Sequence, residues 1–447
     1  MTRSGTAQMR LHRRPSGGAP ARKISAARGA QSKLTNPPAP THSGVGDVAV
    51  GVIFGILSAS NLVQGAWTTQ LPWLDLTTAS FILAVPATLF ALTRRVRLSG
   101  FLCLFLLIAS VSFGFIEPAL GAEAVSKRIN IGAAVLFVLA ASFLSLSNRR
   151  RIKALCVTIV VLAFVVVIGQ VVAPDPIALD TGRRTPVGLN AIGSGRAVGA
   201  GLVVVLAFAA SVRKMRHLLS LSVLALPLAL GLYWASSRGP VLGVLVAVVL
   251  IVWKQPMLRR SIKVGLLTAG AVVGLIAYRK LVVSGSRLVE SSGSGRETLY
   301  REALHIASTH PAGVGWGNFY RFVPPALLDS DQGEKLYAHN IILEFWIEAG
   351  FAGAILFLVF FVIVMRRGLQ QASSTMGIAL AALAISSFVG ALLSSDIVGN
   401  RMMWVVFGAI LAAPLANTAN GVHQPPPRKE SPRIRELRRL AEMPSAS

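Results

Sequence analysis

Charged residues are scarce in this chain of 447 residues: they make up 14% of the sequence, against 53% for hydrophobic residues. Soluble globular domains carry far more charge, so this composition excludes that class of protein. Cysteine is nearly absent, and Cys103 and Cys156 both lie within apolar runs, which excludes a disulfide framework or a cysteine metal site. The chain also lacks a P-loop, a dinucleotide-binding glycine fingerprint and an HExxH zinc motif. We therefore expect no metal ion and no cofactor.

Long apolar runs recur along the whole sequence, at lengths near the roughly 20 residues that a helix needs to cross a bilayer. This pattern predicts an all-α, polytopic membrane helix bundle with about 12 transmembrane helices between residues 47 and 418. The predicted spans lie near 48–66, 76–93, 98–116, 129–147, 152–173, 196–212, 218–235, 239–253, 262–278, 339–364, 373–394 and 399–417.

Both ends of the chain are basic. Residues 1–46 hold no acid and are rich in Gly, Pro, Ser and Ala, so we expect a disordered cytoplasmic tail. Residues 419–447 form a second basic tail, in which Ile434, Leu437 and Leu440 recur at helical spacing and favour a short helix on anionic lipid. Nucleic-acid binding is the alternative explanation for such tails. We expect none, because both tails flank a membrane body.

Basic residues also predict the orientation. If the N-terminus is cytoplasmic, the cytoplasmic loops read TRRVR, NRRRIK, RKMRH, KQPMLRRSIK and MRRG, and none of them contains an acid. An excess of Lys and Arg marks cytoplasmic loops, so both termini are expected inside. Arginines in the opposite loops run against this bias and need another explanation.

The longest predicted outer loop, residues 279–338, has readable local structure. Ser294 and Glu297 form a capping-box pattern that predicts the start of a helix, and Pro311 requires the helix to stop near Thr309. Leu299, Ala303, Leu304 and Ala307 would line one face of this amphipathic helix. The glycines of the following PAGVGWGN allow tight turns and close backbone approach.

This loop, running into HPAGVGWGNF and then AHNIILEFWIEAGFAG, resembles the signature region of the O-antigen ligase and polymerase family. The earlier SSRGP resembles the Ser-Arg-Gly element of that family. The resemblance implies a multi-pass protein of the bacterial plasma (inner) membrane with its site facing outside. It implies an inverting, metal-independent glycosyltransferase that takes glycan from an undecaprenyl-diphosphate-linked donor. The acceptor can be a glycan, a lipid or a protein, and membrane lipids surround the site.

Three residues are the predicted catalytic set. A departing diphosphate gains negative charge, and the planar guanidinium groups of Arg238 and Arg296 suit its oxygens. Arg296 falls in the first turn of the predicted helix, where free backbone N–H groups also attract anions. His339 is the predicted base for the acceptor hydroxyl, because an imidazole titrates near neutral pH. Asn340 either orients His339 or a substrate oxygen, or caps the helix.

Other candidates lie nearby. Arg184 and Arg196, with Arg183, are weaker substrate-binding candidates in an outer loop. Aromatic residues of the long loop could stack on sugars or anchor the protein at the membrane interface; they are Tyr300, Trp316, Tyr320 and Tyr337. Glu344 and Glu348 lie four residues apart on one helical face, so we expect them to point into the bundle and pair with an arginine. His310 is interpreted as structural, and His305 as a poor base.

Two other functions remain open from the sequence. A multi-pass transporter or flippase of lipid-linked glycan would share the predicted topology, but such proteins usually show paired halves and ionisable residues near the bilayer midplane. The glycosyltransferases that polymerise peptidoglycan share the lipid diphosphate chemistry, but the His-Asn element is not their signature. Whether the acceptor makes the protein a ligase, a polymerase or a protein glycosyltransferase also stays open.

Overall fold

The computed structural model describes residues 44–68, 75–92, 98–180, 182–212, 214–255, 260–261, 263–265, 268, 294–325, 337–394 and 396–413. The predicted tail 419–447, and nearly all of the tail 1–46 and of the span at 262–278, lie outside these residues. So does much of the predicted outer loop 279–338. The rest of that loop, which carries the family signature, is described.

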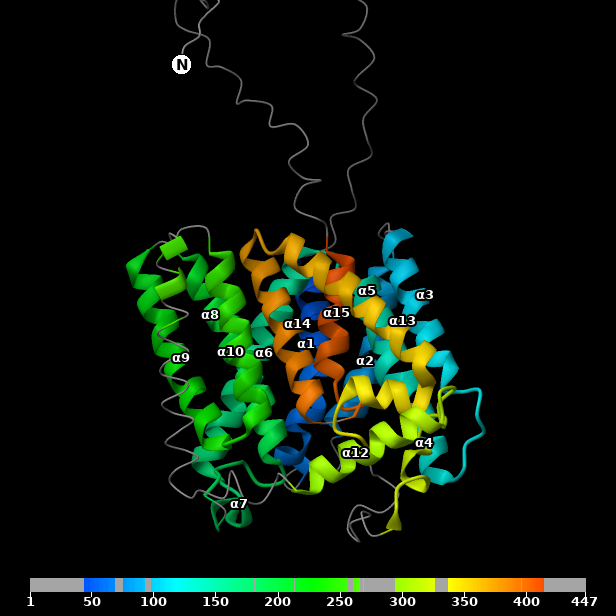
Figure 1. The fold of residues 1–447 in the computed structure, drawn as a ribbon. Helices are drawn as coiled ribbons and strands as arrows, with labels where there is room; N and C mark the ends of the chain where they lie inside the picture. Colours follow the sequence, from blue (N-terminus) through cyan, green and yellow to red (C-terminus); the bar gives the residue numbers. More distant parts are fainter. Residues whose placement is uncertain are drawn as a thin grey trace, which may run out of the picture. The chain divides into compact units, whose positions relative to one another are not determined.

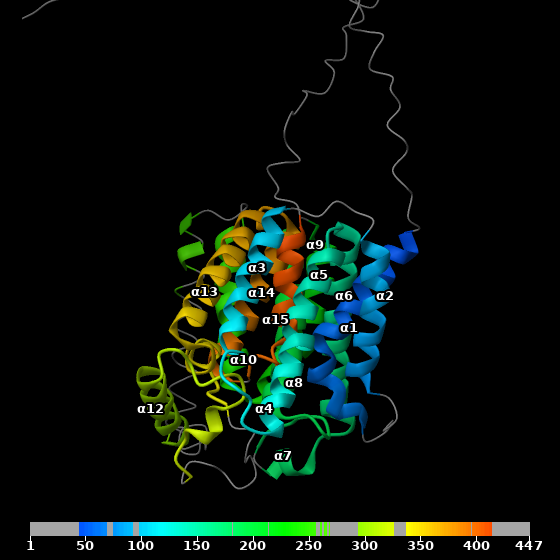
Figure 2. The ribbon, with the colours of Figure 1, turned by 90° about the vertical axis from the view of Figure 1, so that its right-hand side faces the viewer.

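The described residues form helices (Figures 1 and 2). In chain order these are α1 (Gly44–Thr68), α2 (Leu76–Ala91), α3 (Leu98–Phe113), α4 (Ala122–Ile131), the π-helical η1 (Gly132–Phe137), α5 (Val138–Ser145), α6 (Arg149–Val172), α7 (Pro176–Asp180), α8 (Ala191–Ser211), α9 (Met215–Ala235), α10 (Arg238–Lys254), α12 (Ser294–Thr309), the 3-10 turn η2 (Phe319–Arg321), α13 (Ile341–Gln371), α14 (Thr375–Leu393) and α15 (Arg401–Ala412). In this part of the chain there is no β-strand, only one isolated bridge between Pro174 and Pro186. The expectation of an all-α fold is therefore confirmed.

Six of the described helices are long and apolar enough to cross a membrane by length and composition. They are Ala122–Ser145, Arg149–Val172, Ala191–Ser211, Met215–Ala235, Ile341–Gln371 and Thr375–Leu393. Every predicted span except 262–278 coincides with a described helix, while the total of about 12 spans stays a prediction. One boundary was wrong: the basic MRRG was predicted as a loop, but Met365 and Gly368 are buried residues of α13, which continues to Gln371.

Small residues let the helices approach closely. Gly55 of α1 lies against Thr158 of α6, and Gly201 of α8 lies against Ala163 of α6, with no room for a side chain at either glycine. Close backbone approach of this kind is what holds helices together where lipid supplies no hydrophobic driving force. These contacts set α6 between α1 and α8.

A buried ion pair joins α1 to α6. Arg151 is fully buried, and its Nε lies 2.7 Å from Asp47 Oδ1. Its NH1 donates to the carbonyl oxygen of Ser145 at 2.8 Å, and Asn148 Nδ2 donates to Asp47 Oδ2 at 2.6 Å. The predicted cytoplasmic segment NRRRIK is thus fixed to the first turn of α1.

The opposite end of the bundle, which carries α4, α7 and α12 in both views (Figures 1 and 2), is named the loop end here. Helix α12 has the predicted bounds Ser294–Thr309. Its buried face consists of Leu299, Ala303, Ile306 and Ala307. Leu304 was predicted on this face but is 47% exposed, because Ile306 takes the inward position instead.

Candidate functional site

Helix α13 is broken at Gly350, whose φ of 72° and ψ of 177° are non-helical. The first part, Ile341–Ala349, is named the half-helix below. Asn340 caps its start, because Asn340 Oδ1 accepts hydrogen bonds from the backbone N–H groups of Ile342 at 3.0 Å and Leu343 at 3.2 Å. Of the two roles open to Asn340, the structure shows capping, and a role toward substrate stays a prediction.

The glycine-rich segment 311–318 crosses this break. Val314 N donates to the Ile347 carbonyl at 2.8 Å, and Gly315 N donates to the Glu348 carbonyl at 3.0 Å. These are carbonyl groups that a helix end leaves without partners. The segment follows this path because Gly313, Gly315 and Gly317 adopt φ of 89°, 86° and 81°, which confirms the predicted tight turns and close approach.

Trp316 is a packing residue of this segment. Its side chain is 0% exposed, its indole N–H donates to the Val111 carbonyl at 2.7 Å, and its ring meets Phe345 edge-on at 5.2 Å between centroids. A ring enclosed in this way offers no face to a sugar. The predicted stacking role of Trp316 therefore does not fit the structure.

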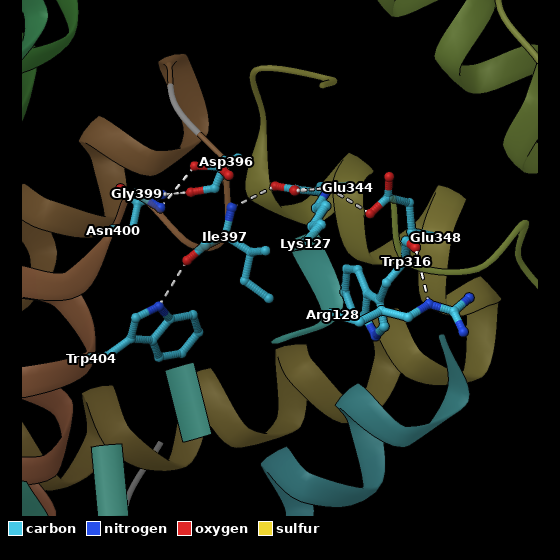
Figure 3. Close-up of polar contacts among 10 residues, drawn as sticks. All are labelled: Lys127, Arg128, Trp316, Glu344, Glu348, Asp396, Ile397, Gly399, Asn400 and Trp404. Carbon is cyan, nitrogen blue, oxygen red and sulfur yellow. Dashed lines mark hydrogen bonds and ion pairs between the residues drawn. The ribbon is translucent and has the colours of Figure 1, made fainter. Parts of the chain in front are cut away.

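A buried ion bridge holds the side of the half-helix (Figure 3). Lys127 Nζ of α4 lies 2.7 Å from Glu344 Oε1 and 2.6 Å from Glu348 Oε2. The two carboxylates point into the bundle as predicted, but the expected arginine partner was wrong, since the cation is Lys127. The sequence did contain a signal: Lys127 and Arg128 lie on the predicted outer side, against the charge bias.

The turn 396–400 between α14 and α15 continues this polar layer (Figure 3). Glu344 Oε2 accepts a hydrogen bond from Ile397 N at 2.8 Å. Asp396 Oδ1 accepts from Gly399 N at 2.7 Å, and Asn400 Nδ2 donates to the Asp396 carbonyl at 2.6 Å. The half-helix and this turn are therefore connected directly through the Glu344 carboxylate.

Arg196 of α8 holds the other side of the same turn. Its NH1 donates to Asn400 Oδ1 at 3.0 Å, and its NH2 donates to the Gly390 carbonyl at 2.6 Å and to Ser394. A cation on the last carbonyls of a helix stabilises that helix end. Arg196 thus clamps the end of α14, and only its buried Nε makes no hydrogen bond within the described part of the chain. Arg196 also lines a cavity of about 30 Å³, which is large enough for a water molecule.

The SSRGP turn lies next to this clamp. A Cβ on Gly195 would approach Pro240 at 3.0 Å, and one on Gly239 would approach Ser394 Oγ at 3.6 Å, so the turn packs between α8 and α14. Arg238 begins α10, and its exposed side chain makes no hydrogen bond to another described residue. The guanidinium of Arg238 is therefore open to an anion.

Arg184 joins the same side of the loop end. Its backbone N donates to the Trp234 carbonyl at 2.9 Å, and its guanidinium lies over the Trp234 ring at 5.2 Å from the centroid. Trp234 stands just before the SSRGP turn in the chain. Arg184, Arg196 and Arg238 thus lie on segments that contact one another at the loop end, and Arg183 is exposed.

His339 has a left-handed backbone with φ of 53°. Its ring is partly buried and lies 4.3 Å from the Tyr337 ring, centroid to centroid. Tyr337 in turn lies within electrostatic range of the Arg196 guanidinium. His339 is therefore in contact with a residue that lies close to Arg196.

The remaining predicted residues lie on or near α12. Arg296 is in its first turn, as predicted, but its side chain lies outside the described part of the structure. Tyr300 is partly buried on α12, and His305 is exposed. His310 packs its ring edge-on against Phe322 at 4.9 Å between centroids, which agrees with a structural role.

No group of three or more His, Cys, Asp or Glu side chains that could hold a metal ion is found among the described residues.

The chain was also compared with known proteins. No curated protein matches it. Residues 223–358, which run from α9 through SSRGP, α12 and the glycine-rich segment into α13, match the family model described as O-antigen ligase. Together with the apolar helices, this match supports assignment of the chain to the O-antigen ligase family of bacterial membrane proteins, which are glycosyltransferase-like enzymes acting on lipid-linked glycans.

Proposed function

We propose that this protein transfers glycan from an undecaprenyl-diphosphate-linked donor to an acceptor hydroxyl at the outer face of the plasma membrane. One observation carries the proposal. In the described part of the chain, two non-glycine residues have positive φ, Ser236 at 48° and His339 at 53°. They lie in the SSRGP and His-Asn elements, two of the three segments for which the sequence predicted catalytic residues. Strained backbone persists where the surrounding structure enforces it, and such positions cluster at functional sites.

The arrangement supports distinct roles for its cations. The exposed Arg238 guanidinium is available to diphosphate oxygens, while hydrogen bonds to protein engage most of the Arg196 guanidinium. Arg296 would add a second cation at the N-terminus of α12, where backbone N–H groups also favour an anion. These groups would stabilise the charge that develops on the leaving group as the glycosidic bond breaks.

His339 completes the reaction. Its imidazole takes the proton from the acceptor hydroxyl as that oxygen attacks the anomeric carbon. The bond from the anomeric carbon to the diphosphate oxygen breaks at the same time, and undecaprenyl diphosphate leaves with the electron pair. Attack opposite the leaving group inverts the anomeric configuration, and no step needs a metal ion. The flippase alternative gains no support from the described residues.

The test is glycan transfer by the purified protein in lipid vesicles, using a lipid-linked glycan as donor. His339→Ala should lower the rate roughly a hundredfold or more, as expected for a positioned general base. His217→Ala is the matched control, because His217 is exposed at the opposite end of the bundle. Equal transfer by the two variants would reject His339 as the base.

Two further measurements complete this test. The anomeric configuration of the product, compared with that of the donor, should be inverted, and chelators should leave the rate unchanged. In a deletion strain, accumulated single lipid-linked repeats would indicate a polymerase, and accumulated long lipid-linked chains would indicate a ligase.

A further inference from the structure

The ion bridge of Lys127 is buried more deeply than a simple surface pair. The Lys127 side chain is 12% exposed, and both carboxylates that it contacts are 2% exposed. Removing charges from water is costly, and replacing a buried ion pair with apolar residues is often neutral or stabilising. A contribution to stability is therefore a weak explanation for the presence of this ion bridge, and we look for a second role in the elements that it connects.

The bridge joins elements that carry the predicted chemistry. Lys127 forms ion pairs with Glu344 and Glu348 of the half-helix. The second carboxylate oxygen of Glu344 accepts a hydrogen bond from Ile397 N. The turn of Ile397 also contains Asn400, which accepts a hydrogen bond from Arg196. A continuous set of contacts thus leads from α4 through the half-helix to Asn400 (Figure 3), and Asn400 in turn contacts Arg196.

The half-helix needs such an anchor because Gly350 separates it from the rest of α13. The rest of α13 packs against α3, where a Cβ on Gly353 would approach the Ser110 carbonyl at 3.1 Å. The glycine-rich segment 311–318 fixes the far end of the half-helix, beside Gly350. Lys127 contacts the side of the half-helix at both Glu344, in its first turn, and Glu348, near Gly350. His339 stands two residues before Ile341, at the start of the half-helix.

We infer that Lys127 is a positioning residue, which sets the half-helix and therefore His339 relative to the Arg196 clamp and the SSRGP turn. This inference rests on the proposed function only in giving His339 a catalytic role. Glu344 and Glu348 lie four residues apart on one helical face, so a single compact ammonium can reach both. Lysine suits this position because it acts as a point charge, whereas arginine presents a broader planar fork.

Kinetics give the first test. A displacement of about 1 Å at a reacting group can cost on the order of a hundredfold in rate. We expect K127M to lower kcat about tenfold or more, while KM for the lipid-linked donor changes less than about twofold. Because K127M leaves two buried carboxylates without a cation, the neutral variant K127M/E344Q/E348Q is measured beside it and should show the same loss of kcat. Lys153→Met is the control, since Lys153 is exposed near the other end of the bundle.

Rescue by charge exchange separates positioning from simple loss of a charge. K127E/E348K keeps one ammonium and two carboxylates between α4 and the half-helix, so it should recover most of the kcat that K127M loses. If the exchanged protein is as slow as K127M, or if donor KM rises in step with the fall of kcat, the inference is overturned.

A second test does not depend on glycan transfer. Cys103 and Cys156 are buried, so a cysteine introduced by His339→Cys would be the reactive thiol in an otherwise unchanged chain. Adding the neutral triple substitution should change its alkylation rate several-fold. The same substitutions should leave the rate at Arg238→Cys unchanged, because the SSRGP turn packs on α8 and α14 instead. Equal rates at position 339 with and without Lys127 would overturn the inference, whereas failure of glycan transfer with a changed rate would overturn only the proposed function.

Discussion

Gly350→Ala tests whether the break in α13 is built into the fold. Gly350 has φ of 72°, a conformation in which residues with a side chain are strained. A Cβ at this position would also stand 2.5 Å from the Ala312 carbonyl oxygen and 2.8 Å from the Pro311 carbonyl oxygen. The substitution therefore forces either a strained backbone or a separation of the half-helix from the segment 311–318.

The size of the effect follows from these contacts. A residue held in a sparsely populated backbone region costs about 1–3 kcal/mol. Separation would in addition break the hydrogen bonds that Val314, Gly315 and Phe351 make across the break, each contributing about 1 kcal/mol. The protein should adopt the cheaper of the two arrangements, so we expect a loss of about 1–3 kcal/mol in the free energy of unfolding.

The control is Gly132→Ala. Gly132 has a helical φ of −55°, and a Cβ there would meet nothing within 4 Å. This change should be neutral or stabilise the protein by about 0.5–1 kcal/mol. Both variants are unfolded with denaturant in detergent micelles and followed by tryptophan fluorescence. If Gly350→Ala unfolds at the same denaturant concentration as Gly132→Ala, the break is not enforced by the contacts described here.

Three further predictions use the same unfolding assay. Arg151→Met should lower the free energy of unfolding by about 3–5 kcal/mol, because the buried Asp47 carboxylate loses the Arg151 guanidinium. Adding Asp47→Asn should recover part of that loss. A larger loss in the double variant would contradict the pairing. Asn340→Ala should cost about 1 kcal/mol through the lost cap, while Asn340→Asp should not, since aspartate also caps helices. Trp316→Phe should lower the free energy of unfolding by about 1 kcal/mol, because the Val111 carbonyl loses the indole donor and keeps only the backbone N–H of Gly114. It should leave the KM for the lipid-linked donor unchanged, and a raised KM would support the sugar-stacking role.

Local signals in the sequence predicted local structure well. The capping pattern at Ser294 and the proline at 311 gave the bounds of α12, and the glycines of PAGVGWGN gave the tight turns. The spacing of Glu344 and Glu348 predicted that both point inward. Each of these features depends on residues close together in the chain, for which backbone sterics and helical periodicity are sufficient.

Features that depend on distant partners could not be read in this way. Lys127 and Glu344 are far apart in the sequence, and only the packing of α4 on α13 brings them together. Trp316 carries no local mark that distinguishes a buried ring from an interfacial one. Leu304 was instead an error of local periodicity: Ile306, three residues after Ala303, shares the buried face of α12, whereas Leu304 lies off that face.

The final prediction concerns two arginines that the sequence treated alike. Arg196 donates to the Gly390 carbonyl, Ser394 and Asn400, whereas Arg238 is exposed and open to an anion. Lysine keeps the charge but lacks the fork that reaches several acceptors at once. Arg196→Lys should therefore lower the free energy of unfolding by about 1–3 kcal/mol, because buried acceptors lose their donors. Arg238→Lys should leave unfolding unchanged and reduce glycan transfer instead, with exposed Arg216→Lys as the control for both assays. If Arg196→Lys unfolds like the parent protein and loses only glycan transfer, Arg196 is a substrate ligand. The assignment of Arg196 to stabilising the fold and of Arg238 to binding the donor is then wrong.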